Sequence, residues 1–172
     1  MECRTGLSEV LTLIDPEPPH RRVFLVVADE SREMRSALRF ACRRAVHTDG
    51  HVALLGVVEP VEFQQWLGVG RVMEEEARAA VEEHLNELAG EVFAMTGSLP
   101  TLYLRTGRRR DELLALLEEE PDISLLVLGT AVDGDDPGPL VNELIAKGGQ
   151  RLRLPVTLVP GNLTTEEIDA LS

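Results

Sequence analysis

The sequence VFLVVA at residues 23–28 is a continuous apolar run. A strand that covers a core with one face alternates apolar and polar residues, whereas an unbroken apolar run indicates a strand buried on both faces. Such strands are typical of parallel sheets that carry helices on both sides. The run therefore predicts the central strand of an α/β domain.

Outward from this strand, the chain alternates between apolar runs and amphipathic stretches. Ser31 is a suitable N-cap for a helix whose apolar residues recur at helical spacing from Met34 to Ala45. Further strands are predicted at residues 52–58, 102–104, 123–128 and 155–159. Further helices are predicted from Met73 to Phe93, from a cap at Asp111 through Leu117, and from Val141 to Leu152. Five strands alternating with four helices predict an α/β fold with a five-stranded parallel sheet.

The two ends of the chain differ from this pattern. Residues 1–20 combine a short amphipathic segment with a proline-rich linker, and they are predicted to dock on the domain or on a partner, or to remain a frayed tail. Residues 21–161 form the predicted domain. Residues 162–172 are predicted to form a short helix, because Thr164 and Glu167 have the spacing of a capping box.

Composition excludes several classes of function. The net charge is −13, which repels nucleic acid backbones and anionic lipid surfaces. The two cysteines, Cys3 and Cys42, lie far apart, and no secretory signal or membrane-spanning run is apparent, so we expect a cytoplasmic protein. Cys42 falls on an apolar helix face and is expected to be a buried thiol.

Ligands of open parallel sheets bind beyond the carboxyl ends of the strands, where the strand order reverses. Asp29 follows the first strand, Val57 lies at the end of the second, and Gly129 and Thr130 follow the fourth. Neither a dinucleotide-binding glycine fingerprint nor a Walker motif is present. A phosphoacceptor receiver domain is excluded as well, because Arg105 lies where that domain needs an aspartate.

Several short motifs occur in order along residues 21–160. They are Val27-Ala28-Asp29 followed by Ser31, then Val57-Val58-Glu59, Gly107 before a helix, Leu126-Val127-Leu128-Gly129-Thr130, and Leu154-Pro155-Val156-Thr157-Leu158-Val159. In this order and spacing they resemble the universal stress protein family. The resemblance implies a Rossmann-like sheet of the adenine nucleotide alpha hydrolase type, with strand order 3-2-1-4-5, and a role in stress response.

The resemblance also implies a nucleotide site, with Asp29 and the backbone at Val57 against adenine and with Gly129 and Thr130 near the phosphates. ATP-binding members carry a glycine, two residues, a second glycine, nine residues, and a third glycine followed by Ser or Thr. Without a gap, this motif falls on four positions, of which only the first keeps its residue. These positions are Gly129, Val132, Asn142 and Glu143. A second register through Gly138 and Gly148 leaves too few residues for a full helix before Pro155, so the gapless register is favoured.

This erosion argues against ordinary ATP binding. Val132 adds a branched side chain where the backbone must approach a phosphate, and Glu143 replaces a hydroxyl donor with a negative charge. The loop at residues 133–136 adds three carboxylates. A magnesium ion bridging carboxylates and phosphates would restore ATP binding, and AMP or adenosine would suffer less repulsion. The same loop fails as a calcium site, because its twelfth position is Leu144.

The remaining polar groups are assigned to the surface. Arg108, Arg109 and Arg110 are interpreted as a solvated run, with an anion site beside the next helix as the alternative. The four histidines, His20, His47, His51 and His84, show no ligand spacing and are expected at the surface. No metal site and no catalytic residue is predicted, and Ser31 is assigned to capping.

The leading hypothesis is a non-catalytic protein that acts in stress response through protein association. By resemblance, it forms a homodimer through the edge of the last strand, at Val156, Thr157, Leu158 and Val159. The alternative is an adenine-nucleotide switch or slow ATPase that uses the same crevice. A third hypothesis is an interaction module that docks an unknown protein partner through residues 1–20.

Overall fold

The computed structural model describes residues 21–60, 69–132, 137–144 and 152–172. Residues 1–20 and the acidic loop at 133–136 lie outside the described residues, so the predictions for them do too. The strands are β1 (Val23–Ala28), β2 (His51–Val58), β3 (Thr101–Thr106), β4 (Ile123–Thr130) and β5 (Val156–Pro160). The helices are α1 (Arg32–Thr48), α2 (Val69–Thr96), α3 (Arg109–Glu119), α4 (Pro139–Glu143) and α5 (Thr165–Leu171).

The five strands form one parallel sheet in the order β3-β2-β1-β4-β5, which confirms the predicted fold class and strand order. β1 lies at the centre, where Val26 pairs with Leu54 on one side and Val127 on the other. All three side chains are fully buried. The unbroken apolar run thus reflects burial on both faces, as expected for a central parallel strand.

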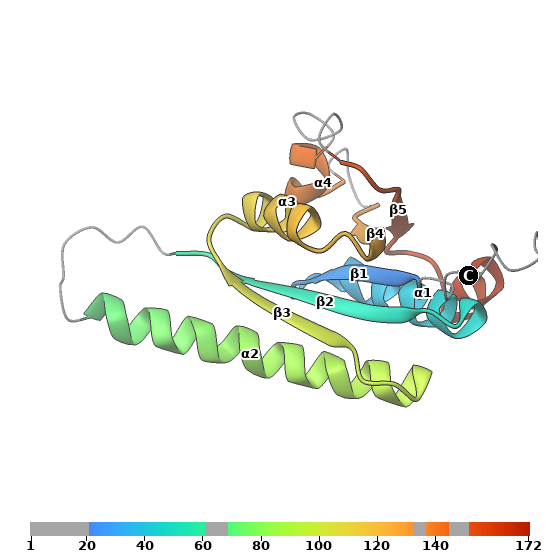
Figure 1. Ribbon diagram of the computed structural model, residues 1–172, viewed down its shortest axis with the longest axis horizontal. Coiled ribbons are helices and arrows are strands. Elements are labelled where there is room, and N and C mark those ends of the chain that lie inside the picture. Colours follow the sequence, from blue (N-terminus) through green and yellow to red (C-terminus); the bar gives the residue numbers. More distant parts are fainter. Residues whose placement is uncertain (1–20, 61–68, 133–136, 145–151) are drawn as a thin grey trace, which may run out of the picture.

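Helices cover both faces of the sheet (Figure 1). α1 and α2 pack on one face, and α3 and α4 pack on the other. Cys42 lies in the α1 layer, where burial raises the pKa of its thiol to about 12. A thiol with that pKa is almost entirely protonated at neutral pH, so Cys42 is not an available nucleophile.

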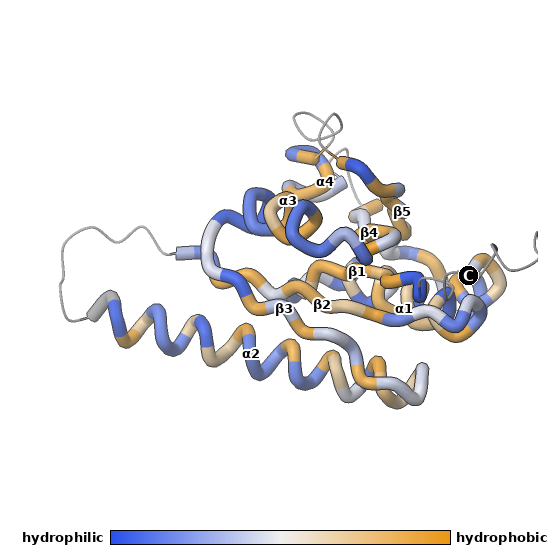
Figure 2. The backbone as a smooth tube through the Cα atoms, in the orientation of Figure 1, coloured by the Kyte–Doolittle hydropathy of each residue, from blue (hydrophilic) through white to orange (hydrophobic). Residues whose placement is uncertain are grey.

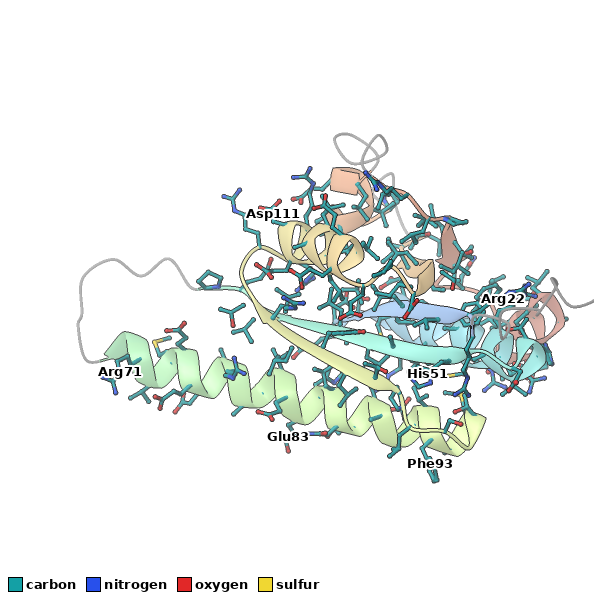
Figure 3. All side chains as sticks on the ribbon, viewed as in Figure 1. Arg22, His51, Arg71, Glu83, Phe93 and Asp111 are labelled. Atoms are coloured by element: carbon teal, nitrogen blue, oxygen red, sulfur yellow. The ribbon has the colours of Figure 1, made fainter. Side chains whose placement is uncertain are left out.

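Two predictions about α2 are corrected. The helix begins at Val69, and its first turns extend beyond the sheet (Figure 1). Met73 and Phe93, the two ends of the apolar stripe that predicts this helix, are 42% and 51% exposed. Met73 lies in the first turns, which the sheet does not cover, whereas Phe93 follows the buried Val92 and points away from the sheet (Figure 3). Helical periodicity does not show whether a sheet lies beneath a face. Figure 2 accordingly shows α2 alternating in hydropathy while β1 and β2 are mainly hydrophobic.

The helix starts are correct for α1 and wrong for α3. Ser31 caps α1 by accepting a hydrogen bond from the amide of Met34 at 3.2 Å. Asp111 does not cap α3: the N-cap is Arg108, which makes no side-chain capping bond, and Asp111 lies inside the first turn. The Thr164 and Glu167 capping box of α5 is confirmed.

Of the predicted helix from Val141 to Leu152, the structure describes α4, Leu144 and Leu152. Leu152 is half-buried and lies in the connection before β5, outside any helix, so the predicted helix end is wrong. Val141 and Leu144 are buried, as predicted, and Ile145 lies outside the described residues. Among the helices that the structure describes, none is both long and apolar enough to cross a membrane.

Candidate functional site

A cavity of ≈ 220 Å³ opens at the carboxyl ends of β1 and β4. These neighbouring strands are not consecutive in the chain, so the strand order reverses between them. Asp29 lies on one side of the cavity and Gly129 on the other, over apolar side chains such as Val27 and Leu128. This is the position at which open α/β sheets bind ligands.

Local hydrogen bonds orient Asp29. Its Oδ1 accepts from the amide of Ser31 at 2.9 Å, directly before α1 begins. Its backbone carbonyl lies 3.1 Å from Nε2 of His84, which reaches over from α2. The second carboxylate oxygen, Oδ2, is 3.9 Å from Nη1 of Arg109 on α3. Residues from three helices therefore converge on the end of β1.

Gly129 is needed for packing as well as for the cavity. A Cβ at this position would overlap the backbone carbonyl of Glu33, in the first turn of α1. A Cβ at Gly161 would lie 2.6 Å from Cγ of the same glutamate. The two glycines therefore let α1 approach the ends of β4 and β5 closely, and this requirement holds with or without a ligand.

A second cavity, of ≈ 360 Å³, adjoins the first. Arg108, Arg109 and Arg110 line it, together with the carboxylates of Glu59, Asp111 and Glu143. Arg109 also lines the first cavity. Figure 3 shows the beginning of α3 at Asp111, on the face of the sheet opposite α2.

Glu59 takes the role that a capping side chain would have at the start of α3. Its Oε1 lies 3.3 Å from the amide nitrogen of Arg109, which donates the hydrogen bond. Its Oε2 lies 3.5 Å from Nη2 of Arg109. The residue after β2 thus occupies the first free amide of α3.

The cavities contain three of the seven residues proposed for nucleotide binding. Asp29 and Gly129 line the first cavity, and Glu143 lines the second. The other four line neither cavity: Val57 is buried in the core, Thr130 is half-buried, and Val132 and Asn142 are exposed. Gly138, from the second register of the motif, also lines the first cavity, while Gly148 lies outside the described residues.

Sequence reasoning assigned Arg109 and Arg110 to solvent, and the structure corrects this assignment. Their side chains are only 31% and 21% exposed. The signal that favours the alternative, an anion site, is position: the run follows β3, and the carboxyl ends of parallel strands meet at one edge of the sheet. The turn at Gly107 brings the arginines to the same end of the sheet.

Two of the histidines assigned to the surface are half-buried. His84 contacts the carbonyl of Asp29, as described above, and Nε2 of His51 lies 2.9 Å from the hydroxyl of Thr101. Burial, and then the charge of Arg21, lowers the pKa of His51. Within the described part of the chain, no three His, Cys, Asp or Glu side chains are placed to share a metal ion.

The comparisons with known proteins agree with this architecture. A family model described as the universal stress protein family matches residues 20–159. No curated protein matches the chain significantly.

Solved structures of universal stress proteins share the fold at low sequence identity. The protein UspA from Lactobacillus plantarum is 16% identical, with a TM-score of 0.68 over 80% of this chain and 97% of that one. One from Archaeoglobus fulgidus, in complex with dAMP, is 17% identical, with a TM-score of 0.58 over 81% and 97%. One from Arabidopsis thaliana, with AMP bound, is 14% identical, with a TM-score of 0.51 over 85% and 94%.

Proposed function

This chain belongs to the universal stress protein family, and we propose that it is a non-catalytic, cytoplasmic stress-response protein that binds an adenine mononucleotide in the crevice between β1 and β4. The observation that carries the proposal is the first cavity, at the point where the strand order reverses. Structures of similar fold were solved with dAMP and with AMP. The apolar floor of the cavity suits a planar base, and Asp29 supplies an acceptor at its edge.

Charge at the crevice favours a monophosphate over ATP. Glu143 lines the second cavity, where a phosphate chain leaving the first would extend. Each uncompensated contact between a phosphate and a carboxylate costs about 1–4 kcal/mol, depending on exposure. The arginines on the same wall can pair with one phosphate group, whereas the further phosphates of ATP would also meet Glu143, so this carboxylate penalises ATP more strongly than AMP.

The proposed lack of catalysis rests on the positions of His84 and Cys42, which line neither cavity. Nε2 of His84 contacts a backbone carbonyl, and Cys42 is a buried thiol with a pKa raised to about 12. Neither side chain is therefore placed to act as a nucleophile or base toward a ligand in the cavities. We therefore expect no ATP turnover above the rate in buffer, measured as phosphate release with and without magnesium.

Calorimetry on nucleotide-free protein tests the binding proposal. AMP should bind more tightly than ATP. Magnesium should reduce the difference between the two affinities by screening the carboxylates. ATP binding at micromolar concentrations, tighter than AMP, would contradict the proposal and favour the ATP switch. Absence of both AMP and adenosine binding would remove the nucleotide from the function.

We propose that the protein associates with a second copy of itself through β5. This strand lies at one edge of the sheet, and Leu158 on it is 44% exposed. An edge strand presents unpaired amides and carbonyls that a second copy can pair with. The amides of β5 alternate in direction, and that of Gly161 donates to the carbonyl of Thr130 at 2.9 Å, so the amide of Thr157 faces β4 and that of Leu158 faces the free edge. Leu158→Pro therefore removes an edge amide and should convert a dimer into a monomer in gel filtration. A dimer that persists in the folded variant would place the interface elsewhere.

A further inference from the structure

The second cavity carries an inference about ligand selection, which rests on the proposed function. Three consecutive arginines line it in a chain whose net charge is −13. Arg109 lines both cavities, as do Pro139 and Leu140, so the two cavities adjoin at these residues. A nucleotide whose base lies in the first cavity can therefore place its phosphate group beside the arginines of the second cavity.

The three arginines have N–H donors that are unpaired or only weakly paired within the described residues. Arg108 is exposed and makes no ion pair with any residue that the structure describes. Arg110 contacts Asp111 at 3.3 Å, while its Nε is buried and finds no hydrogen-bond acceptor among the residues that the structure describes. Arg109 lies 3.5 Å from Glu59 and 3.9 Å from Asp29, longer than the 2.7–2.9 Å typical of charge-assisted hydrogen bonds.

The carboxylates on the same wall are easier to displace than the arginines. The side chains of Glu59 and Asp111 are 54% and 56% exposed, so both can rotate into water. Arg109 and Arg110 are mostly buried and remain in the wall. A phosphate monoester offers several oxygens in the geometry that guanidinium groups bind in pairs.

We propose that the second cavity is a phosphate subsite, in which Arg108, Arg109 and Arg110 bind the phosphate of a nucleoside monophosphate. The phosphate is thereby bound at the start of α3, and the eroded glycine motif, which runs from β4 into α4, is not required for it. Arg109 moves from Asp29 toward the phosphate, which frees Oδ2 of Asp29 to accept from the base. Base binding and phosphate binding are thus coupled through one guanidinium.

The test measures AMP, adenosine and inorganic pyrophosphate binding to the full chain and to four variants. Arg109→Gln and Arg110→Gln remove the buried guanidiniums, and Arg108→Gln removes an exposed one that has no partner to disrupt. Arg71→Gln, on the exposed start of α2, is the matched control for loss of one positive charge (Figure 3). Thermal melting identifies any variant that fails to fold, and Arg108→Gln keeps the test valid in that case.

We expect AMP to bind at least about tenfold more tightly than adenosine, and each crevice variant to weaken AMP by about tenfold. Adenosine affinity should stay within about twofold in Arg108→Gln and Arg110→Gln. Arg71→Gln should match the parent protein.

The inference and the proposed function fail separately. Equal affinity for AMP and adenosine overturns the phosphate subsite and leaves the base-binding crevice intact. Pyrophosphate binding that depends on the arginines, without adenosine or AMP binding, overturns the nucleotide function and supports an anion site. Binding of none of the three compounds overturns both.

Discussion

The two flanks of the crevice are built in opposite ways. On the α1 flank, Ser31 caps the helix and glycines bring its first turn into direct contact with the ends of β4 and β5. On the α3 flank, the N-cap Arg108 makes no side-chain capping bond, and Glu59, the residue after β2, reaches over to the first amide. In the proposed nucleotide complex, the close-packed α1 flank contacts the base, and the charged α3 flank binds the phosphate.

Gly129→Ala should have the largest effect on this comparison. The added Cβ meets backbone of α1, which cannot yield without moving the helix, so the free energy of unfolding should fall by about 3 kcal/mol. Gly90→Ala is the matched control, since nothing lies within 4 Å of a Cβ there. It lies inside α2 and should stabilise the protein by up to about 1 kcal/mol. Equal denaturation midpoints for the two variants would refute the close packing of α1.

Gly138→Ala should lower the free energy of unfolding by less than Gly129→Ala does, and for a different reason. Gly138 has φ +113°, which L side chains rarely adopt, while no atom lies within 4 Å of its would-be Cβ. Conformational strain alone should lower the free energy of unfolding by about 2 kcal/mol. Gly138→Ser should cost the same within error in urea denaturation, because space is not limiting. A markedly larger cost for serine would show that this side of the crevice is packed as tightly as the other.

Substitutions at the N-caps of α1 and α3 should change the free energy of unfolding in opposite directions. Ser31→Ala leaves the amide of Met34 without its acceptor and should destabilise the protein by about 1 kcal/mol. Arg108→Ser places a hydroxyl at an N-cap whose backbone is already extended, and should stabilise the protein by about 0.5 kcal/mol. Thermal melting compares them, and a loss of stability in Arg108→Ser would mean that its guanidinium already supports the fold.

Low pH should weaken the ion pair that joins Asp169 of α5 to Arg39 of α1. Arg39 donates two hydrogen bonds to Asp169, at 2.9 and 2.7 Å, and these lower the pKa of that carboxyl below its ordinary value of 3.8. A depressed pKa in the folded state stabilises it above the unfolded value, and this contribution is lost as the pH falls below 3.8 toward the folded value. The melting temperature of the parent protein should therefore approach that of Asp169→Asn on acidification. A difference between the two proteins that is unchanged from pH 6 to pH 2 would contradict the ion pair.

Much of the fold follows from local patterns. The apolar run at residues 23–28 is buried on both faces, and the capping residues Ser31 and Thr164 act at the predicted positions. These features depend on neighbours within a few residues, so composition and spacing are enough to find them. The exposed first turns of α2 could not be predicted in this way, because periodicity defines a face without saying whether a sheet lies beneath it.

The sequence by itself determined the fold class and, through family resemblance, the strand order. Only the tertiary structure decided that Gly129 faces Glu33, that Glu59 reaches the start of α3, and that Arg109 stands between two cavities. The contact between Gly129 and Glu33 and that between Glu59 and Arg109 each join residues at least 50 positions apart. Local patterns carry no record of such contacts, because they arise only when parallel strands bring their carboxyl ends to one edge of the sheet.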